Sequence, residues 1–355
     1  MSPQEAAYVS RMSLNDLEAI RLVLSGDSVI DWFRIDVRNG DQLEILLKVN
    51  GYDLSNIHDQ KRMAYLQQEA LKYLDDQYPH QIPQVLREPR LDIRGLFEFA
   101  SLPAKRSASQ LFACMILKIM HTINHLDARE LFHRCELKAS ELFAAVEHKV
   151  ENAVHAMQKE GFHIVDLYGS HKDRASMITK LLAKKENHAA AIYDKIRFRI
   201  ITKCLPDILP MIYFMGRTIC PFNYIIPGGS HNNLISFTDL LGYFPSFQHY
   251  TNLLKRRGAS TSLHSSAFEN EHSSAEYKVI NFVSDIPIRV DEFLYTPDFA
   301  ELGRIIFVPV EFQIMDEVTY QTNELGSASH SKYKQRQLES VKARLGPNGS
   351  SLFRT

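Results

Sequence analysis

The sequence lacks a charge of one sign, paired cysteines and long apolar runs. Its 355 residues carry 41 Lys plus Arg against 42 Asp plus Glu, a net charge of −1, so no global field draws the chain toward nucleic acid or an anionic membrane. The four cysteines form no CxxC pair. This argues against a zinc knuckle or a disulfide framework and fits a reducing cytoplasm.

Membrane and export signals are missing as well. The first residues, MSPQEAAYVSRMSLND, do not follow the basic and then apolar layout of a signal peptide. No run approaches the roughly 18 apolar residues of a membrane span. We therefore expect a cytoplasmic protein with no membrane partner, and its 45% hydrophobic residues are enough for two domains or one large one.

Helical periodicity dominates the first part of the chain. Ser13 is a predicted N-cap, with Asp16 three residues on, for an amphipathic stretch that ends at Gly26. The segment 109–132, SQLFACMILKIMHTINHLDARELF, is apolar nearly all round, which predicts a buried helix. We expect an all-helical domain over residues 1–150.

Strand-like segments begin near residue 160. They are GFHIVDLYG, KIRFRIITK, YKVINFVSDIPIRV and RIIFVPVEFQI, with the helical stretch DRASMITKLLAKKENHAAAIY between the first two. The expected fold class is α+β, with the helical domain followed over residues 151–340 by a mixed β-sheet flanked by helices. The Gly-, Asn-, Ser- and His-rich composition of residues 221–274 predicts a long flexible loop, and residues 341–355 are expected to form a flexible tail.

One strand carries polar residues in a pattern that indicates chemistry. Glu311 and Gln313 alternate with Phe312 and Ile314, so both polar side chains should leave the same face of the strand. A lone buried carboxylate is costly, and a divalent metal ion or a substrate hydroxyl would offset that cost.

A second acid and a group of cations have a matching arrangement. Asp194 lies just before a strand that places Arg197 and Arg199 on one face. Three upstream residues recur every four positions and so share one side of a helix: Lys172, Ser176 and Lys180. Two carboxylates at strand positions with clustered cations are what phosphoryl-type transfer requires, because acids hold Mg²⁺ while Lys and Arg hold phosphates.

These residues resemble the synthetase domain of the RelA/SpoT family, the alarmone (ppGpp) synthetases of the stringent response, over roughly residues 150–340. The family helix Arg-x-Lys-x-x-x-Ser-x-x-x-Lys is matched from Lys172 onward, and Asp194 precedes Arg199 by the family's five residues. The family strand Glu-x-Gln-Ile is matched at residues 311–314. Its downstream motif is matched at Glu324, Gly326, Ala328, His330, Tyr333 and Lys334. The resemblance implies a nucleotidyltransferase-like sheet in a divergent member that lacks the HD hydrolase domain.

The acceptor side keeps less of the family pattern. Tyr277 corresponds to the purine-stacking tyrosine of the family, and Asn281 stands where the family has His. The stretch NYIIPGGSHNNL, from Asn223, is similar to the start of the acceptor loop, so the resemblance implies an insertion over about residues 228–274.

Other departures concern the phosphates. Ser170 replaces the first Arg of the helix pattern, and Met315 and Asp316 replace an Arg-Thr pair. Two expected phosphate-binding arginines are therefore missing, whereas the metal acids and the ATP-side lysines are present.

The resemblance implies a Mg²⁺-dependent pyrophosphokinase that transfers pyrophosphate from ATP to the 3′-hydroxyl of a nucleotide. It assigns Mg²⁺ to Asp194 and Glu311, with Glu311 also drawing the proton from the attacking hydroxyl. It assigns ATP to Lys172, Ser176, Lys180 and Arg199, and the acceptor to Tyr277, Gln313, Asn281 and His330. A guanine nucleotide (GDP or GTP) is the first expected acceptor. An adenine nucleotide, the 3′ end of tRNA, or a catalytically silent nucleotide sensor are the alternatives, and the N-terminal domain is expected to regulate or to form homo-oligomers.

Two histidine patterns in the helical region suggest other sites. His58-Asp59 is similar to the metal dyad of the family's hydrolase domain, but that site needs an earlier His and His58 is the first in the chain. Asp59 is better interpreted as an N-cap. His121 and His125 could bind a metal with Asp127, although a buried helix face is the more common reason for such spacing.

Overall fold

The computed structural model describes most of the chain. The described residues are 2–25, 37, 40–79, 81–88, 90–101, 107–135, 137–172, 174–183, 196–226, 228–256, 277–291, 301–325, 334–335 and 338–342. Within these ranges no helix is long and apolar enough to cross a membrane.

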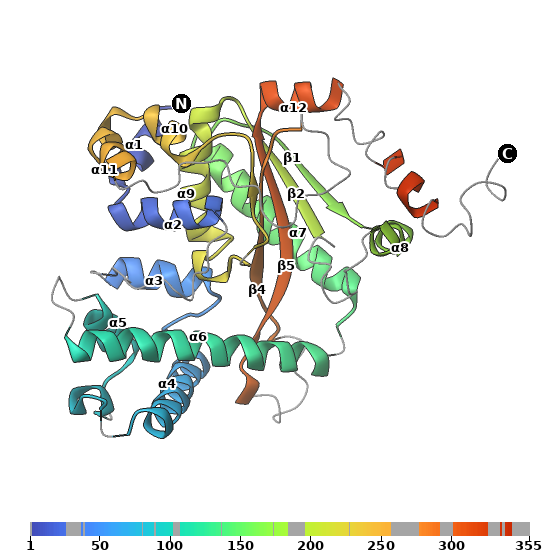
Figure 1. Cartoon of the computed structure of the whole chain (residues 1–355). Coiled ribbons are helices and arrows are strands. Elements are labelled where there is room, and N and C mark those ends of the chain that lie inside the picture. Colours follow the sequence, from blue (N-terminus) through green and yellow to red (C-terminus); the bar gives the residue numbers. More distant parts are fainter. Residues whose placement is uncertain are drawn as a thin grey trace.

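The described residues before position 160 form helices and no strand, in line with the helical pattern of the sequence (Figure 1). The elements are α1 (Pro3–Arg11), α2 (Leu14–Ser25), α3 (Gly40–Val49), α4 (Ile57–Gln77), η1 (Gln84–Arg87), α5 (Ile93–Ala100), α6 (Ala108–Arg134) and α7 (Ala139–Lys159). The predicted cap of α2 is confirmed, because the Ser13 hydroxyl accepts from the backbone N–H of Asp16 over 3.2 Å. The apolar segment 109–132 lies within α6, but the prediction that this helix is buried holds only in part, because Leu111, Leu126 and Phe132 are exposed.

Strands begin at residue 164 and alternate with further helices. The elements are β1 (Ile164–His171), α8 (Arg174–Ala183), β2 (Ile196–Thr202), η3 (Leu205–Asp207), α9 (Ile208–Thr218), η4 (Phe222–Tyr224), β3 (His231–Asn232), α10 (Phe237–Gly242), η5 (Pro245–Phe247), α11 (Gln248–Arg256), β4 (Ile280–Arg289), β5 (Ile305–Asp316) and α12 (Glu317–Leu325). The α+β class is thereby confirmed.

The described strands form one mixed five-stranded sheet in the order β1-β2-β5-β4-β3. β2 runs parallel to β5, and the other neighbours are antiparallel. Alternation gives the sheet two different faces. On one face Phe198, Phe312 and Phe282 stack in a row, with centroids 6.1 Å and 5.4 Å apart. The opposite face is polar at its centre.

Two hydrophobic cores divide the described residues. The first joins the apolar sheet face to α1, α2, α7, α9, α10 and α11. The second lies among α3, α4, α5 and α6, and reaches the sheet through Ile305 and Phe307 of β5. Figure 1 shows α6 running across one end of the sheet. The boundary near residue 150 stays a prediction, but α1 and α2 share a core with the sheet rather than with the other N-terminal helices.

Two expectations from the sequence are wrong. The flexible loop predicted over residues 221–274 is structured in its described part, because α10, η5 and α11 bury apolar side chains such as Leu241, Phe244 and Leu254 in the first core. The N-cap of α4 is Asn56, whose side chain accepts from the N–H of His58 over 2.9 Å. Asp59 is instead buried, and it accepts from Arg289 Nη1 over 2.7 Å.

Candidate functional site

The polar face of the sheet gathers residues from four strands. Strand pairing sets Arg197 of β2 opposite Glu311 of β5 and Asn281 of β4 opposite Gln313 of β5. Ser170 of β1 lies opposite Arg197. The sequence prediction that Glu311 and Gln313 share one face is confirmed, since Gln313 Nε2 donates to Glu311 Oε1 over 3.3 Å.

Glu311 is buried and charge-paired. Only 5% of the residue is exposed, and Arg197 Nε donates to its Oε2 over 2.7 Å. A carboxylate at this depth is stable only with a cation and hydrogen bonds beside it. In this structure Arg197 is that cation, so a metal ion bound by Glu311 would have to share or displace this contact.

Gln313 connects Glu311 to Arg199 and Tyr277 through hydrogen bonds. Its Oε1 accepts from Arg199 Nε and Nη2 over 3.4 and 3.3 Å and from the Tyr277 hydroxyl over 3.5 Å. Arg199 Nη1 also contacts Glu324 Oε1 on α12 over 3.2 Å. Four predicted site residues, Glu311, Gln313, Arg199 and Tyr277, are thereby brought into one connected network.

Aromatic rings flank this network. The Arg199 guanidinium carbon lies 5.8 Å from the centre of the Tyr320 ring, which stacks on Tyr168 at 5.9 Å. Burial raises the pKa of the Tyr277 hydroxyl, although Arg199 and Arg197 partly oppose the shift. The Tyr277 ring is therefore neutral at pH 7 and lies next to two guanidinium groups. Tyr320 was missed in the sequence, although its position four residues before Glu324 on a helix was a usable signal.

Asn281 has an unusual hydrogen-bonding state. It lies on β4 between Gln313 and His231 in the strand register. Its Oδ1 is buried and accepts no hydrogen bond from the described residues, a condition that costs free energy unless a donor arrives. A ligand donor group at this end of the network would remove that cost.

Lys172, which the resemblance assigns to ATP, lies at the same end of the sheet as Glu311. Lys172 directly follows β1, whose last residue His171 pairs with Ile196, next to Arg197. Lys172 and Ser176 are half-buried. The prediction that Lys172 shares one side of a helix with Ser176 is wrong, because α8 begins at Arg174 and Ser176 lies in its first turn. Lys180 belongs to the same helix, and its side chain is outside the described set.

Several motif residues cannot be placed. Asp194 and His330 lie outside the described residues, and of the downstream motif only Glu324 and Lys334 are described. The metal role of Asp194 and the acceptor role of His330 therefore stay predictions. The donor chemistry on the described face is oxygen-rich, with a carboxylate, an amide oxygen and a phenol, and oxygen ligands are those that Mg²⁺ prefers.

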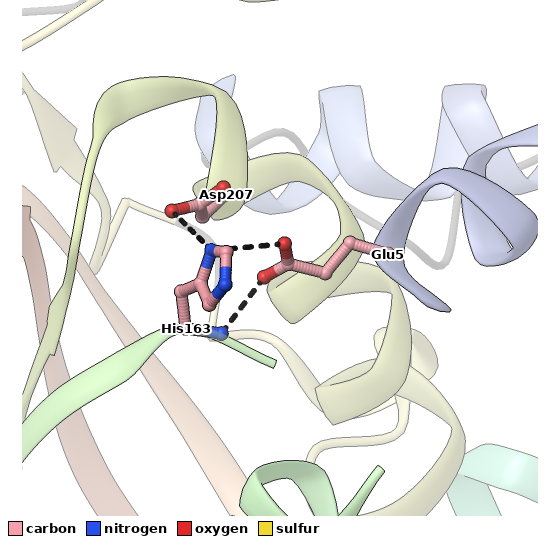
Figure 2. A group of neighbouring side chains, drawn as sticks. All are labelled: Glu5, His163 and Asp207. Carbon is pink, nitrogen blue, oxygen red and sulfur yellow. Dashed lines mark hydrogen bonds and ion pairs between the residues drawn. The ribbon is translucent and has the colours of Figure 1, made fainter. Parts of the chain in front are cut away.

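A second cluster lies at the opposite end of β1 and β2 (Figure 2). His163 Nδ1 is 3.5 Å from Glu5 Oε2 and 3.8 Å from Asp207 Oδ2, and the His163 backbone N–H donates to Glu5 Oε1 over 3.0 Å. Both carboxylates are 1% exposed. Among the described residues this is the one group of three metal-type ligands whose donor atoms lie within 4.8 Å of one another.

The cluster was missed in the sequence because its members are 44 to 202 positions apart, a separation that no local pattern reports. Glu5 also forms the capping box of α1 with Ser2, so the same carboxylate caps the N-terminus of the helix and holds it against the start of β1. These contacts give the cluster a structural role at the α1–sheet contact.

The candidate helical metal site is not assembled among the described side chains. Asp127 pairs with Arg62 Nη2 at 2.8 Å, whereas His125 Nε2 lies 3.5 Å from Asp285 Oδ2. The His121 ring packs at a tilt against Tyr224, with ring centroids 4.5 Å apart. The helical spacing of the two histidines therefore serves packing against the end of the sheet.

No family model and no curated protein matches the sequence. Structural similarity is found to small alarmone synthetase 1 of Bacillus subtilis bound to its product pppGpp, with 15% identity, 57% of this chain and 85% of that chain covered, and a TM-score of 0.31. Small alarmone synthetase 2 of Bacillus subtilis is 13% identical, with 57% of this chain and 86% of that chain covered and a TM-score of 0.34. A GTP pyrophosphokinase family protein of Streptococcus pneumoniae is 12% identical, with 57% of this chain and 83% of that chain covered and a TM-score of 0.28. The chain is thus similar in part of its structure to small alarmone synthetases.

Proposed function

We propose that the polar sheet face is the active site of a pyrophosphokinase, which moves the β,γ-pyrophosphoryl group of ATP to the 3′-hydroxyl of a nucleotide. The observation that supports this most directly is the pairing of buried Glu311 with Arg197 beside the Gln313–Arg199–Tyr277 network. A buried acid, two arginines and a neutral phenol at one sheet end supply a proton acceptor, phosphate ligands and a base-stacking ring.

The proposed reaction needs no oxidant or reductant. The acceptor 3′-oxygen attacks the β-phosphorus, the bond from that phosphorus to the α,β-bridging oxygen breaks, and AMP leaves with the electron pair. Glu311 takes up the hydroxyl proton, and Lys172 and Arg199 neutralise phosphate charge. Bound Mg²⁺, held by Glu311 and Asp194, would supply further charge neutralisation across the phosphates.

A guanine nucleotide is the proposed acceptor, with Tyr277 stacked on its base. The unpaired Oδ1 of Asn281 supports an acceptor with N–H or O–H donors at its edge. Guanine carries two such donors on its Watson–Crick edge and adenine carries one exocyclic amine. An adenine nucleotide and the 3′ end of tRNA are the alternatives in the same chemistry. We place the reaction in the cytoplasm, where the four free cysteines would stay reduced.

A second candidate function is a nucleotide sensor without transfer activity. It is favoured by the state of Glu311, because Arg197 occupies one carboxylate oxygen and Gln313 the other. A carboxylate held in this way is already neutralised without a metal ion.

The test is transfer of label from [β-³²P]ATP with Mg²⁺ to GDP, GTP, ADP, AMP and bulk tRNA in separate reactions, with AMP release measured in parallel. We expect labelled product with a guanine nucleotide. In Glu311→Gln the rate should fall by about a hundredfold or more, because the proton acceptor and a metal ligand are both removed.

The matched control is Glu317→Gln. Glu317 is another acid at the β5–α12 junction, but it pairs with Lys203 away from the network, so its rate should match that of the wild type. ATP binding without AMP formation under any condition would favour the sensor. If label reaches only ADP, AMP or tRNA, that molecule is the acceptor and the proposal of a guanine nucleotide is wrong.

A further inference from the structure

A cavity of about 140 Å³ lies between the helical body and η4. Its walls come from α3, α4, α5 and α6, and η4 closes one side. The apolar part includes Met63, Leu66, Phe97 and Met120, all of which are buried. This volume is close to the roughly 150 Å³ of an apolar cavity that accepts a benzene-sized molecule.

One end of the cavity is polar and its hydrogen bonds fix the orientation of two amides. Asn50 Nδ2 donates to the carbonyl of Leu46 over 2.7 Å, so Asn50 Oδ1 must face the other way. Asn223 Nδ2 donates to that Oδ1 over 2.9 Å. The carbonyl oxygen of Asn223 consequently points away from Asn50, and it is buried and accepts no hydrogen bond from the described part of the chain.

The histidine at the polar end is uncharged. Burial lowers the pKa of His121 to about 4, so its imidazole is neutral at pH 7. The side chain of Asn223 approaches His121 Nδ1 at 3.4 Å. A contact from an N–H donor indicates that Nδ1 is the unprotonated nitrogen. Lys118 is the single Lys, Arg, Asp or Glu among the described lining residues.

We propose that this cavity is a binding site for a small uncharged aromatic molecule that carries one hydroxyl or ring N–H group. The ring would lie among the apolar side chains of the helical body, and its O–H or N–H would donate to Asn223 Oδ1. Burying an unpaired carbonyl costs free energy, and a donor from the ligand removes that cost. The unpaired acceptor repels an anionic oxygen and accepts from a donor, which favours an uncharged donor group over an anion even with Lys118 on the same wall.

The site is separate from the polar sheet face and does not depend on the pyrophosphokinase proposal. It is nevertheless connected to the sheet, because Ile225, which directly follows η4, bridges to Ser284 of β4. The neighbouring Tyr224 hydroxyl accepts from Asn124 of α6 over 3.2 Å. A ligand that orders Asn223 therefore contacts the segment that enters the sheet.

The test is calorimetric titration of the full chain with phenol, toluene and benzoate. Phenol should bind about tenfold more tightly than toluene, which fills the same volume without a donor. Benzoate should bind more weakly than phenol. Equal binding of phenol and toluene would overturn the proposed acceptor role of Asn223 and leave an apolar void only, and tighter binding of benzoate would overturn the uncharged class.

Two variants on α6 localise the binding. Met120→Trp fills the cavity and should weaken phenol binding by about tenfold or more, whereas Met115→Trp, on the same helix outside the lining, should not. In Asn223→Ala the affinity for phenol should fall to the affinity for toluene. Unchanged phenol affinity in a folded Met120→Trp variant would overturn the proposal.

A second measurement needs no variant. Nuclear Overhauser contacts from the phenol ring to the methyl groups of Met63 and Leu66 are expected in the wild type. Absence of these contacts at saturating phenol would overturn the proposed binding site, even if the Met120→Trp variant failed to fold.

Discussion

Arg197 and Glu311 lie directly opposite each other on the parallel strands β2 and β5, and their side chains meet at 2.7 Å. They are 114 residues apart in the sequence. Because the Glu311 side chain is 7% exposed and that of Arg197 is 21% exposed, the pair is shielded enough for each partner to depend on the other.

Removal of the arginine should destabilise the fold. In Arg197→Leu the buried carboxylate loses its cation, and we expect the free energy of unfolding to fall by about 2–4 kcal/mol. Urea denaturation of the single variant and of Arg197→Leu/Glu311→Gln measures this, and the double variant should recover part of the loss. A single variant as stable as the wild type would show that the pair contributes nothing to stability.

The same variant tests whether Glu311 can hold a metal ion. With Arg197 removed, added Mg²⁺ should raise the melting temperature of Arg197→Leu more than that of the wild type, because the ion can take the place of the guanidinium. Addition of Mg²⁺ to Arg197→Leu/Glu311→Gln is the control and should have no such effect.

Tyr277 should matter through its ring rather than through its hydroxyl. The hydroxyl makes a long 3.5 Å contact with Gln313, so Tyr277→Phe should cost about 1 kcal/mol or less in stability. Tyr277→Ala should weaken guanine nucleotide binding by about 1–3 kcal/mol, the range of base stacking on aromatic rings. Fluorescent nucleotide titrations measure the affinity, and Tyr243→Ala is a control at an exposed tyrosine. Equal affinities for the two alanine variants would remove Tyr277 from the acceptor site.

His121 should make stability depend on pH. Its pKa is lowered from 6.5 to about 4 by burial and, to a smaller extent, by His125. Between these values the unfolded chain binds a proton that the folded chain does not, so the His121 contribution to stability is lost as the pH falls from about 6.5 to about 4. In His121→Gln this loss, about 1–3 kcal/mol, should be absent.

The comparison must be made against the wild type at each pH, because Asp285 acts with the opposite sign. Burial raises its pKa from 3.8 to about 6, so its contribution is present at low pH and is lost as the pH rises toward 6. The difference between wild type and His121→Gln in chemical denaturation isolates the histidine. A difference that is constant from pH 4 to 7 would contradict the expectation.

Two glycines give a matched test of backbone conformation. Gly51 has φ of +89°, and a Cβ there would lie 3.1 Å from Ile305 Cδ1. Gly51→Ala should therefore destabilise by about 1–2 kcal/mol. Gly216 lies inside α9, where an added Cβ would meet no described atom within 4 Å, so Gly216→Ala should stabilise by about 0.5–1 kcal/mol. Thermal unfolding with the same sign for both variants would contradict this account.

Sequence patterns succeeded where the information is local. The alternation of Glu311 and Gln313 on β5 and the cap of α2 at Ser13 depend on neighbouring residues, and both are confirmed. The partner of Glu311 could not be chosen from sequence, because Arg197 and Arg199 share a face and only the β2–β5 register decides between them. Asp59 could not be separated from Asn56 as a cap, because both are good N-cap residues at a helix start.

Composition misled the prediction between residues 221 and 274. Gly, Asn and Ser punctuate the segment, but Leu241, Phe244 and Leu254 between them supply buried contacts. Short helices of this kind are stabilised by tertiary packing rather than by their own propensity. A composition dominated by turn-forming residues therefore does not reveal these short helices.

The placement of α1 and α2 gives the molecule a discontinuous construction. Leu17 of α2 is fully buried with the sheet body, whereas α3 to α6 enclose a core of their own. In topological terms the segment from α3 to α6 is a guest inserted into a host that starts with α1 and resumes at α7. A chain cut at residue 150 would strip the host of two helices and expose α9. Excision of the guest with a short linker would instead remove one member of the host core, Leu131 of α6, and would uncover Ile305 and Phe307 where they meet the guest.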